Sequence, residues 1–131
     1  MEQIVPGLVA EQTKVVMVDD TAEHLGSGTA PVLATPRLIL LLESTAVAAT
    51  RPYLPAGYQT VGVRVDVRHL AATPVGMRVR VRAELVAREG RRLTFRVEAW
   101  DEHELIGEGT HERVLVETAR FMARVEAKLQ R

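Results

Sequence analysis

Three side chains that can move protons or attack a carbonyl stand among residues 35–69 of this 131-residue chain: Thr35, Glu43 and His69. Glu43 is the only charged residue between Arg37 and Arg51, in a stretch that is otherwise almost wholly apolar. We expect such a carboxylate to be buried or nearly so, which destabilises the fold if it has no partner. A structural ion pair, a protonated core acid and a catalytic group are the three explanations, and buried carboxylates concentrate in active sites.

The other candidates also have structural explanations. Thr35 precedes Pro36, and this pair is typical of an N-cap and a first helical residue. His69 falls on an apolar strand face, where most histidines are simply hydrogen-bonded parts of a core. The remaining histidines are expected on loops or exposed strand faces, without the spacing of a metal site: His24, His103 and His111.

The composition narrows the class of protein. With 131 residues, 47% of them hydrophobic, the chain is expected to form one domain over residues 1–131. Seventeen basic and seventeen acidic residues cancel, which argues against nucleic acid or a membrane as a partner. The absence of cysteine excludes a thiolate nucleophile and a cysteine-ligated metal. The N-terminus lacks the pattern of a secretion signal, so we expect a cytoplasmic protein. Separately, we expect neither a metal nor another cofactor.

The elements that position the candidate residues follow from periodicity. Residues 11–19 predict a strand, and residues 20–30 predict a polar loop. The apolar run predicts a helix from Thr35 to about Thr50, ended by the prolines that follow. Because this helix has no polar face, we expect the rest of the fold to enclose it.

From residue 57 to about residue 118 the pattern changes to alternation, which predicts four half-exposed strands. The first of them carries four valines and His69 on one face. The second and third are joined by a tight turn at Glu89 and Gly90. Glycines interrupt the fourth, so a bulge is expected there and the face of Arg113 stays open.

Residues 118–130 predict a short amphipathic helix. A strand, an apolar helix and a meander of four strands together define an α+β hot-dog fold, in which an antiparallel sheet wraps around a central helix. The exposed edges of such a sheet favour at least a homodimer.

A set of short segments, in this order, resembles the fluoroacetyl-CoA thioesterase family of hot-dog enzymes: Ala34-Thr35, Glu43, Arg51-Pro52-Tyr53-Leu54, His69 to Pro74 with Gly76, Glu89 to Leu93, and Gly109 to Arg113. The resemblance implies hydrolysis of an acyl-CoA thioester by Thr35, Glu43 and His69. It also implies that Gly62 and Arg113 lie near the acyl group, and that the enzyme is a homodimer with its sites at the interface.

The chemistry of thioesters suits these residue types. Hydrolysis needs a carboxylate that attacks the carbonyl or directs water, and a group that moves a proton to the departing thiolate. Glu43 suits the first role and His69 the second, while Thr35 can hold the substrate oxygen or water. Eight residues of regular helix separate Thr35 from Glu43 by roughly 12 Å, too far for a hydrogen bond. Either the chain bends before the helix, or the trio assembles across a dimer interface, or substrate and water fill the gap.

The acyl group is less defined by the sequence. Residues 20–30 contain no Phe, Trp or Tyr to close over a very small acyl chain, so we expect a short or medium acyl-CoA rather than fluoroacetyl-CoA. The alternative function is a non-catalytic acyl-CoA binding or sensing module, which a ligand would stabilise without thiol release. An enoyl-CoA hydratase ranks third, because the helix offers one glutamate and no histidine.

Overall fold

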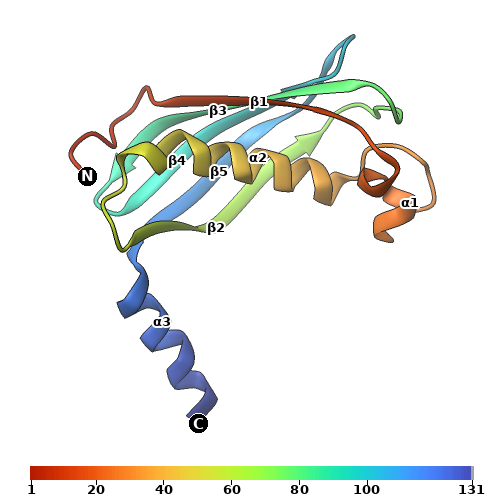
Figure 1. Cartoon of the computed structure of the whole chain (residues 1–131). Helices are drawn as coiled ribbons and strands as arrows, with labels where there is room; N and C mark the ends of the chain where they lie inside the picture. The colour runs from red at the N-terminus through yellow and green to blue at the C-terminus, as the bar shows by residue number, and fades with distance from the viewer. Residues whose placement is uncertain (131) are drawn as a thin grey trace.

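The computed structural model describes residues 1–130 and contains a five-stranded antiparallel sheet of order β1-β3-β4-β5-β2. Helix α2 lies along one face of the sheet, and α3 projects away from the end of β5 (Figure 1). This is the predicted hot-dog fold. Its elements are β1 Val9–Val15, η1 Val18–Asp20, α1 Ala22–Leu25, α2 Thr35–Thr50, η2 Arg51–Tyr53, β2 Tyr58–His69, β3 Arg78–Glu89, β4 Arg92–Trp100, β5 Leu105–Glu117, α3 Thr118–Ala127 and η3 Lys128–Gln130.

Strands β3, up to its bulge after Leu85, and β4 separate the core from solvent by strict alternation. Their outward side chains form ion pairs, as Arg82 does with Glu84 at 3.0 Å. Because successive strand residues point to opposite faces, the other side chains all turn toward α2. The prediction of one core face and one solvated face is confirmed by the fully buried set Val79, Val81, Ala83, Leu85, Leu93, Phe95, Val97 and Ala99.

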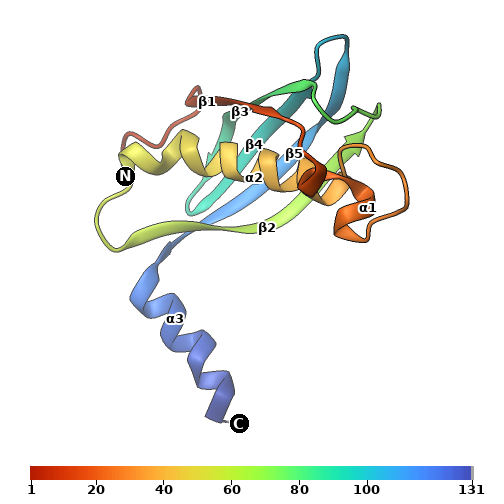
Figure 2. The same ribbon diagram turned by 45° about the vertical axis from the view of Figure 1, so that its right-hand side comes forward.

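Helix α2 is open on one side. Leu38 and Leu42 are buried against the sheet, whereas Leu40 is 48% exposed and Ser44 is exposed. The expectation that the fold encloses the helix is therefore wrong for the single chain, because no element among residues 1–130 covers this face (Figure 2). A helix with apolar residues on every face then leaves some of them in contact with solvent.

The segment before α2 differs in detail from the prediction. Strand β1 begins and ends earlier than residues 11–19, and Val16 already turns into the core. The predicted polar loop contains part of η1 and all of the short helix α1. Buried Asp20 bridges Lys14 and Arg37 at 2.8 Å and 3.1 Å, which ties this segment to the first turn of α2.

Strand β2 is an edge strand with a bulge. Its register with β5 shifts between Gly62 and Arg64, so Val63 is the extra residue. Residues paired across strands point to the same side, and a bulge reverses the alternation that follows it. Val61 therefore faces outward and Val65 faces α2, so the predicted single valine face is wrong. The irregularity predicted in β5 is present, in the slipped pairing with β4 at Ile106.

Candidate active site

The first residue of α2 and the last residue of β2 are joined by a hydrogen bond. Thr35 Oγ1 lies 2.7 Å from His69 Nδ1. The N-cap of α2 is Ala34, and the Thr35 hydroxyl makes no capping bond, so the prediction that Thr35 is the N-cap is wrong. Both residues line a hollow of about 340 Å³ together with Ala22 and Ser27 of the preceding segment. The bond between these two side chains is the first half of the candidate site.

The imidazole of His69 can share a proton with the Thr35 hydroxyl. Burial lowers the pKa of His69, which favours the neutral ring, and the backbone of Ala71 partly offsets this shift. His69 Nε2 is buried and makes no hydrogen bond with any of residues 1–130. Its other nitrogen, Nδ1, contacts the exposed Thr35.

Glu43 belongs to a second cluster, on the open side of α2. Its carboxylate is 36% exposed, so the expectation of near-complete burial is wrong. Glu43 Oε2 lies 3.5 Å from Arg113 Nη1 and 3.9 Å from His111 Nε2. A hollow of about 290 Å³ adjoins the carboxylate and is lined by Leu40, Glu43, Ser44, Val47, Arg51 and Arg113. Glu43 is thus a solvent-accessible carboxylate beside a buried cation.

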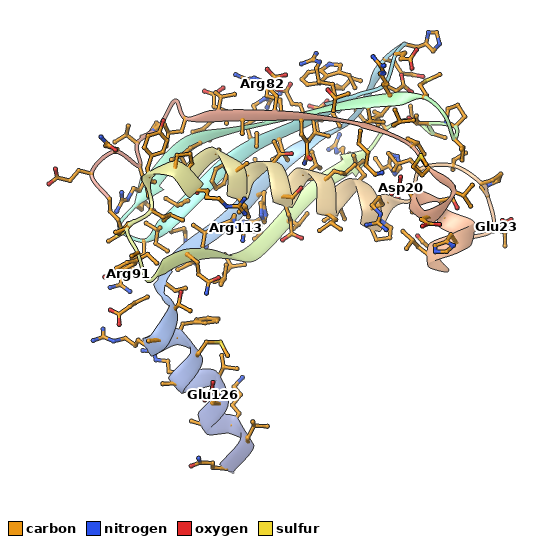
Figure 3. The ribbon with its side chains drawn as sticks, viewed as in Figure 1. Asp20, Glu23, Arg82, Arg91, Arg113 and Glu126 are labelled. Atoms are coloured by element: carbon orange, nitrogen blue, oxygen red, sulfur yellow. The ribbon has the colours of Figure 1, made fainter. Side chains whose placement is uncertain are left out.

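Arg113 answers the question that the sequence left open, because it faces α2 from β5 (Figure 3). Only 7% of it is exposed, so Arg113 is a buried cation and not part of an exposed salt bridge. Its Nε donates to Thr60 Oγ1 and its Nη2 to the Thr60 carbonyl, both at 2.9 Å. Burial lowers the pKa of Arg113, and the charge of Glu43 opposes that shift. The guanidinium is therefore fixed on one side and presents Nη1 to the pocket.

Gly62 leaves room for this cluster. A Cβ built on Gly62 would lie 2.9 Å from Glu43 Oε2, 3.2 Å from Arg113 Nη1 and 3.3 Å from His111 Cε1. The first of these separations is shorter than real Cβ contacts allow, so any side chain here would displace the carboxylate. A close approach of Glu43 to the backbone is the reason for glycine at this position.

His111 is the residue of this cluster that sequence reasoning missed. It was expected on an exposed strand face, and that prediction is wrong: its exposure is 1%. Two glycines and a register slip disturb the start of β5, which hid its alternation. Counting back from buried Leu115 would have placed Arg113 and His111 on the inner face, since every second strand residue points the same way.

The structure brings the five predicted site residues into two groups. Thr35 and His69 form one, and Glu43, Gly62 and Arg113 form the other. Regular helix begins at Thr35 itself, so the chain does not bend back between Thr35 and Glu43, and roughly 12 Å of helix axis separates them. Among residues 1–130, no group of three or more His, Asp or Glu side chains has the geometry of a metal site. No helix in the same residues is long and apolar enough to cross a membrane.

Comparisons with known proteins agree with this fold. The profile of the fluoroacetyl-CoA-specific thioesterase family matches residues 16–119. A fluoroacetyl-CoA thioesterase of Streptantibioticus cattleyicolor is 45% identical over 97 residues, which are 74% of this chain and 70% of that protein. The structure of the fluoroacetyl-CoA thioesterase FlK superposes with a TM-score of 0.88 at 39% identity, over 94% of this chain and 96% of that one.

A thioesterase superfamily member from Thermus thermophilus is similar over 99% of this chain and 98% of its own, with a TM-score of 0.89 and 34% identity. Structures of FlK in which a threonine is replaced have been solved with fluoroacetate and with acetyl-CoA. A structure in which a phenylalanine is replaced has been solved with fluoroacetate and CoA. Fold and relatives together define a hot-dog thioesterase, an enzyme that hydrolyses thioester bonds. The chain belongs to the fluoroacetyl-CoA-specific thioesterase family.

Proposed function

We propose that this enzyme hydrolyses short or medium acyl-CoA thioesters in the cytoplasm, at sites that two copies of the chain build together. The observation that carries the proposal is the division of the candidate residues into two groups, each beside its own hollow. Proton transfer needs direct contact or a single water between the groups involved. Within one chain, Glu43 and the Thr35–His69 pair are too far apart for that.

A two-fold dimer formed along β2 would unite the two groups. Strands β1 and β2 are the two edges of the sheet, and exposed Val63 and Val65 lie on β2 beside the open face of α2. Unpaired edges of this kind are templates for pairing with another strand. Suppose that two β2 strands pair antiparallel about a two-fold axis at Asp66. Because the bulge residue Val63 has no pairing position of its own, the partner's His69 then lies opposite Gly62, on the same side of the sheet. The two groups would then flank one acyl-CoA.

In this site the thioester carbonyl lies between Glu43 and the partner's Thr35. Glu43 takes a proton from water as the water oxygen bonds to the carbonyl carbon. The carbon–sulfur bond then breaks, and the departing thiolate receives a proton from the Thr35 hydroxyl. The proton that Glu43 took from water returns through solvent to the Thr35–His69 pair, so that every residue ends as it began. Gly62 and Arg113 contact the acyl group, and Arg113 Nη1 can stabilise the negative charge that develops there. No metal or other cofactor takes part in these steps.

The segment over the threonine supports the proposed substrate class. Residues Ala22 and Ser27 of that segment are small, and no Phe, Trp or Tyr occurs between residues 20 and 34. An acyl chain longer than two carbons therefore meets no aromatic side chain from this part of the structure. We accordingly propose short or medium acyl groups rather than the fluoroacetyl group of the named relatives.

Thiol release from a panel of acyl-CoAs, from acetyl through medium-chain to phenylacetyl, tests the proposal. Glu43→Gln and His69→Ala should each lower kcat/KM at least about a hundredfold, as expected when a proton-transfer group is removed. Glu126→Gln, on the projecting helix α3, is the matched control and should keep wild-type activity. If no acyl-CoA is hydrolysed while acyl-CoA still raises the melting temperature, the chain is a binding module and the proposal fails.

A further inference from the structure

A buried histidine in the second group has no part in the steps above. His111 lies at the middle of β5, against Phe95 of β4, with ring centroids 6.4 Å apart. Both of its ring nitrogens are engaged. Nδ1 lies 2.7 Å from the carbonyl oxygen of Arg64, in the strand just after the bulge, and Nε2 lies 3.1 Å from Arg113 Nη1.

These two contacts fix the protonation of His111. A backbone carbonyl only accepts hydrogen bonds, so the ring proton must be on Nδ1. A guanidinium only donates, so Nε2 must carry a lone pair. His111 is therefore neutral in the working structure. Burial lowers its pKa and the charge of Arg113 lowers it further, against the opposing effects of the Arg64 backbone, Glu43 and Glu112.

The same contact governs the distance between Arg113 and Glu43. Arginine and a carboxylate that meet without competition pair at about 2.7–2.9 Å, often through two parallel bonds. Here the closest approach of Arg113 Nη1 to Glu43 is 3.5 Å, and the shorter bond of that nitrogen goes to His111. With Thr60 holding the other two nitrogens, His111 keeps Nη1 from closing on the carboxylate.

We propose that His111 is a positioning residue that holds Arg113 aimed at the acyl group and keeps the Glu43 carboxylate free. This inference rests on the proposed function, since it takes Glu43 as the catalytic base. It explains why a hydrogen-bonding side chain is buried at this position, where packing alone would not require one. It also gives the bulge in β2 a role, because the bulge sets where the Arg64 carbonyl meets the ring.

Two substitutions separate positioning from packing. His111→Leu has a similar volume and no acceptor, so Arg113 should close on Glu43. His111→Gln places an amide oxygen near the position of Nε2 and should hold Arg113 in place. Loss of a hydrogen bond to a charged group predicts that His111→Leu lowers kcat about tenfold or more. We expect KM to change less than kcat, and His111→Gln to recover most of the loss.

A double-mutant cycle with Arg113→Met tests the route of the effect. If His111 acts through Arg113, the variant with both His111→Leu and Arg113→Met should be no slower than Arg113→Met alone, within about twofold. Independent, multiplying losses would overturn the proposal. Equal losses in His111→Leu and His111→Gln, with both proteins folded by their melting temperatures, would also overturn it.

Nitrogen NMR supplies a readout that does not depend on turnover. The His111 ring should show the neutral form with its proton on Nδ1, and the Arg113 side-chain signals should move in His111→Leu but little in His111→Gln. A protonated His111 at neutral pH would contradict the inference even in an active enzyme. If the wild type hydrolyses nothing, the proposed function fails by itself, and the NMR result still decides the position of Arg113.

Discussion

At the scale of single residues, Gly62 offers the sharpest prediction. Gly62→Ala places a methyl group 2.9 Å from Glu43 Oε2 and 3.2 Å from Arg113 Nη1, so the carboxylate must move. We expect kcat/KM to fall about tenfold or more, because a misplaced catalytic group costs rate steeply. Val61→Ala, on the outer face of the same strand, is the control and should stay near wild type. Wild-type kinetics in Gly62→Ala would show that Glu43 does not work from its present position.

The sequence alone predicted only part of the chemistry of the site residues. The isolation of Glu43 among apolar residues drew attention to it, although the side chain proved to be accessible. Capping seemed sufficient for Thr35 because its true partner, His69, stands 34 positions further along the chain. Pattern alone does not reveal such a contact. The inward direction of His111 could have been predicted by counting back in steps of two from the buried Leu115. The hydrogen bond that fixes its proton could be seen only in the structure.

At the scale of elements, the exposed edge of β2 is the feature to perturb. Val63 is 50% exposed at the bulge, and a charged side chain there opposes pairing with another strand. Val63→Lys should therefore shift the protein to monomer in light scattering and lower turnover in parallel. Val86→Lys is the matched control, at the bulge of β3, which lies inside the sheet rather than at its edge. A Val63→Lys protein that is monomeric and fully active would contradict the shared site.

The elements themselves were largely predictable, and their irregularities were not. Strands β3 and β4 alternate so regularly that their core faces follow directly from the sequence. The valines of β2 alternate just as regularly through residues 61–67, yet the bulge at Val63 reverses the strand midway. The cause of the bulge lies in the neighbouring strand β5 and in α2, because Glu43 of α2 packs against Gly62. The sequence did not predict the exposed face of α2. A helix that is apolar on every side has the same pattern whether its own chain or a second copy buries it.

At the scale of the whole molecule, the two buried histidines predict a pH dependence of stability. Burial lowers the pKa of both His69 and His111 below the ordinary value of 6.5. The unfolded chain then binds more protons than the folded one in this range, so stability is full above about pH 6.5 and is lost as pH falls through the folded-state values. Denaturation curves between pH 7 and pH 5 should show this decline. His111→Gln should flatten it, and an unchanged slope would mean that His111 is not neutral in the fold.

The central claim is that each site takes Glu43 from one chain and the Thr35–His69 pair from the other. Glu43→Gln and His69→Ala, each expected to be at least about a hundredfold slower alone, can be co-refolded so that mixed dimers form. A mixed dimer then holds one intact site, with Glu43 from the His69→Ala chain and His69 from the Glu43→Gln chain. Since about half of the dimers are mixed, thiol release should return to about a quarter of the wild-type rate. No recovery, with mixed dimers present, would place each site within a single chain and contradict the account.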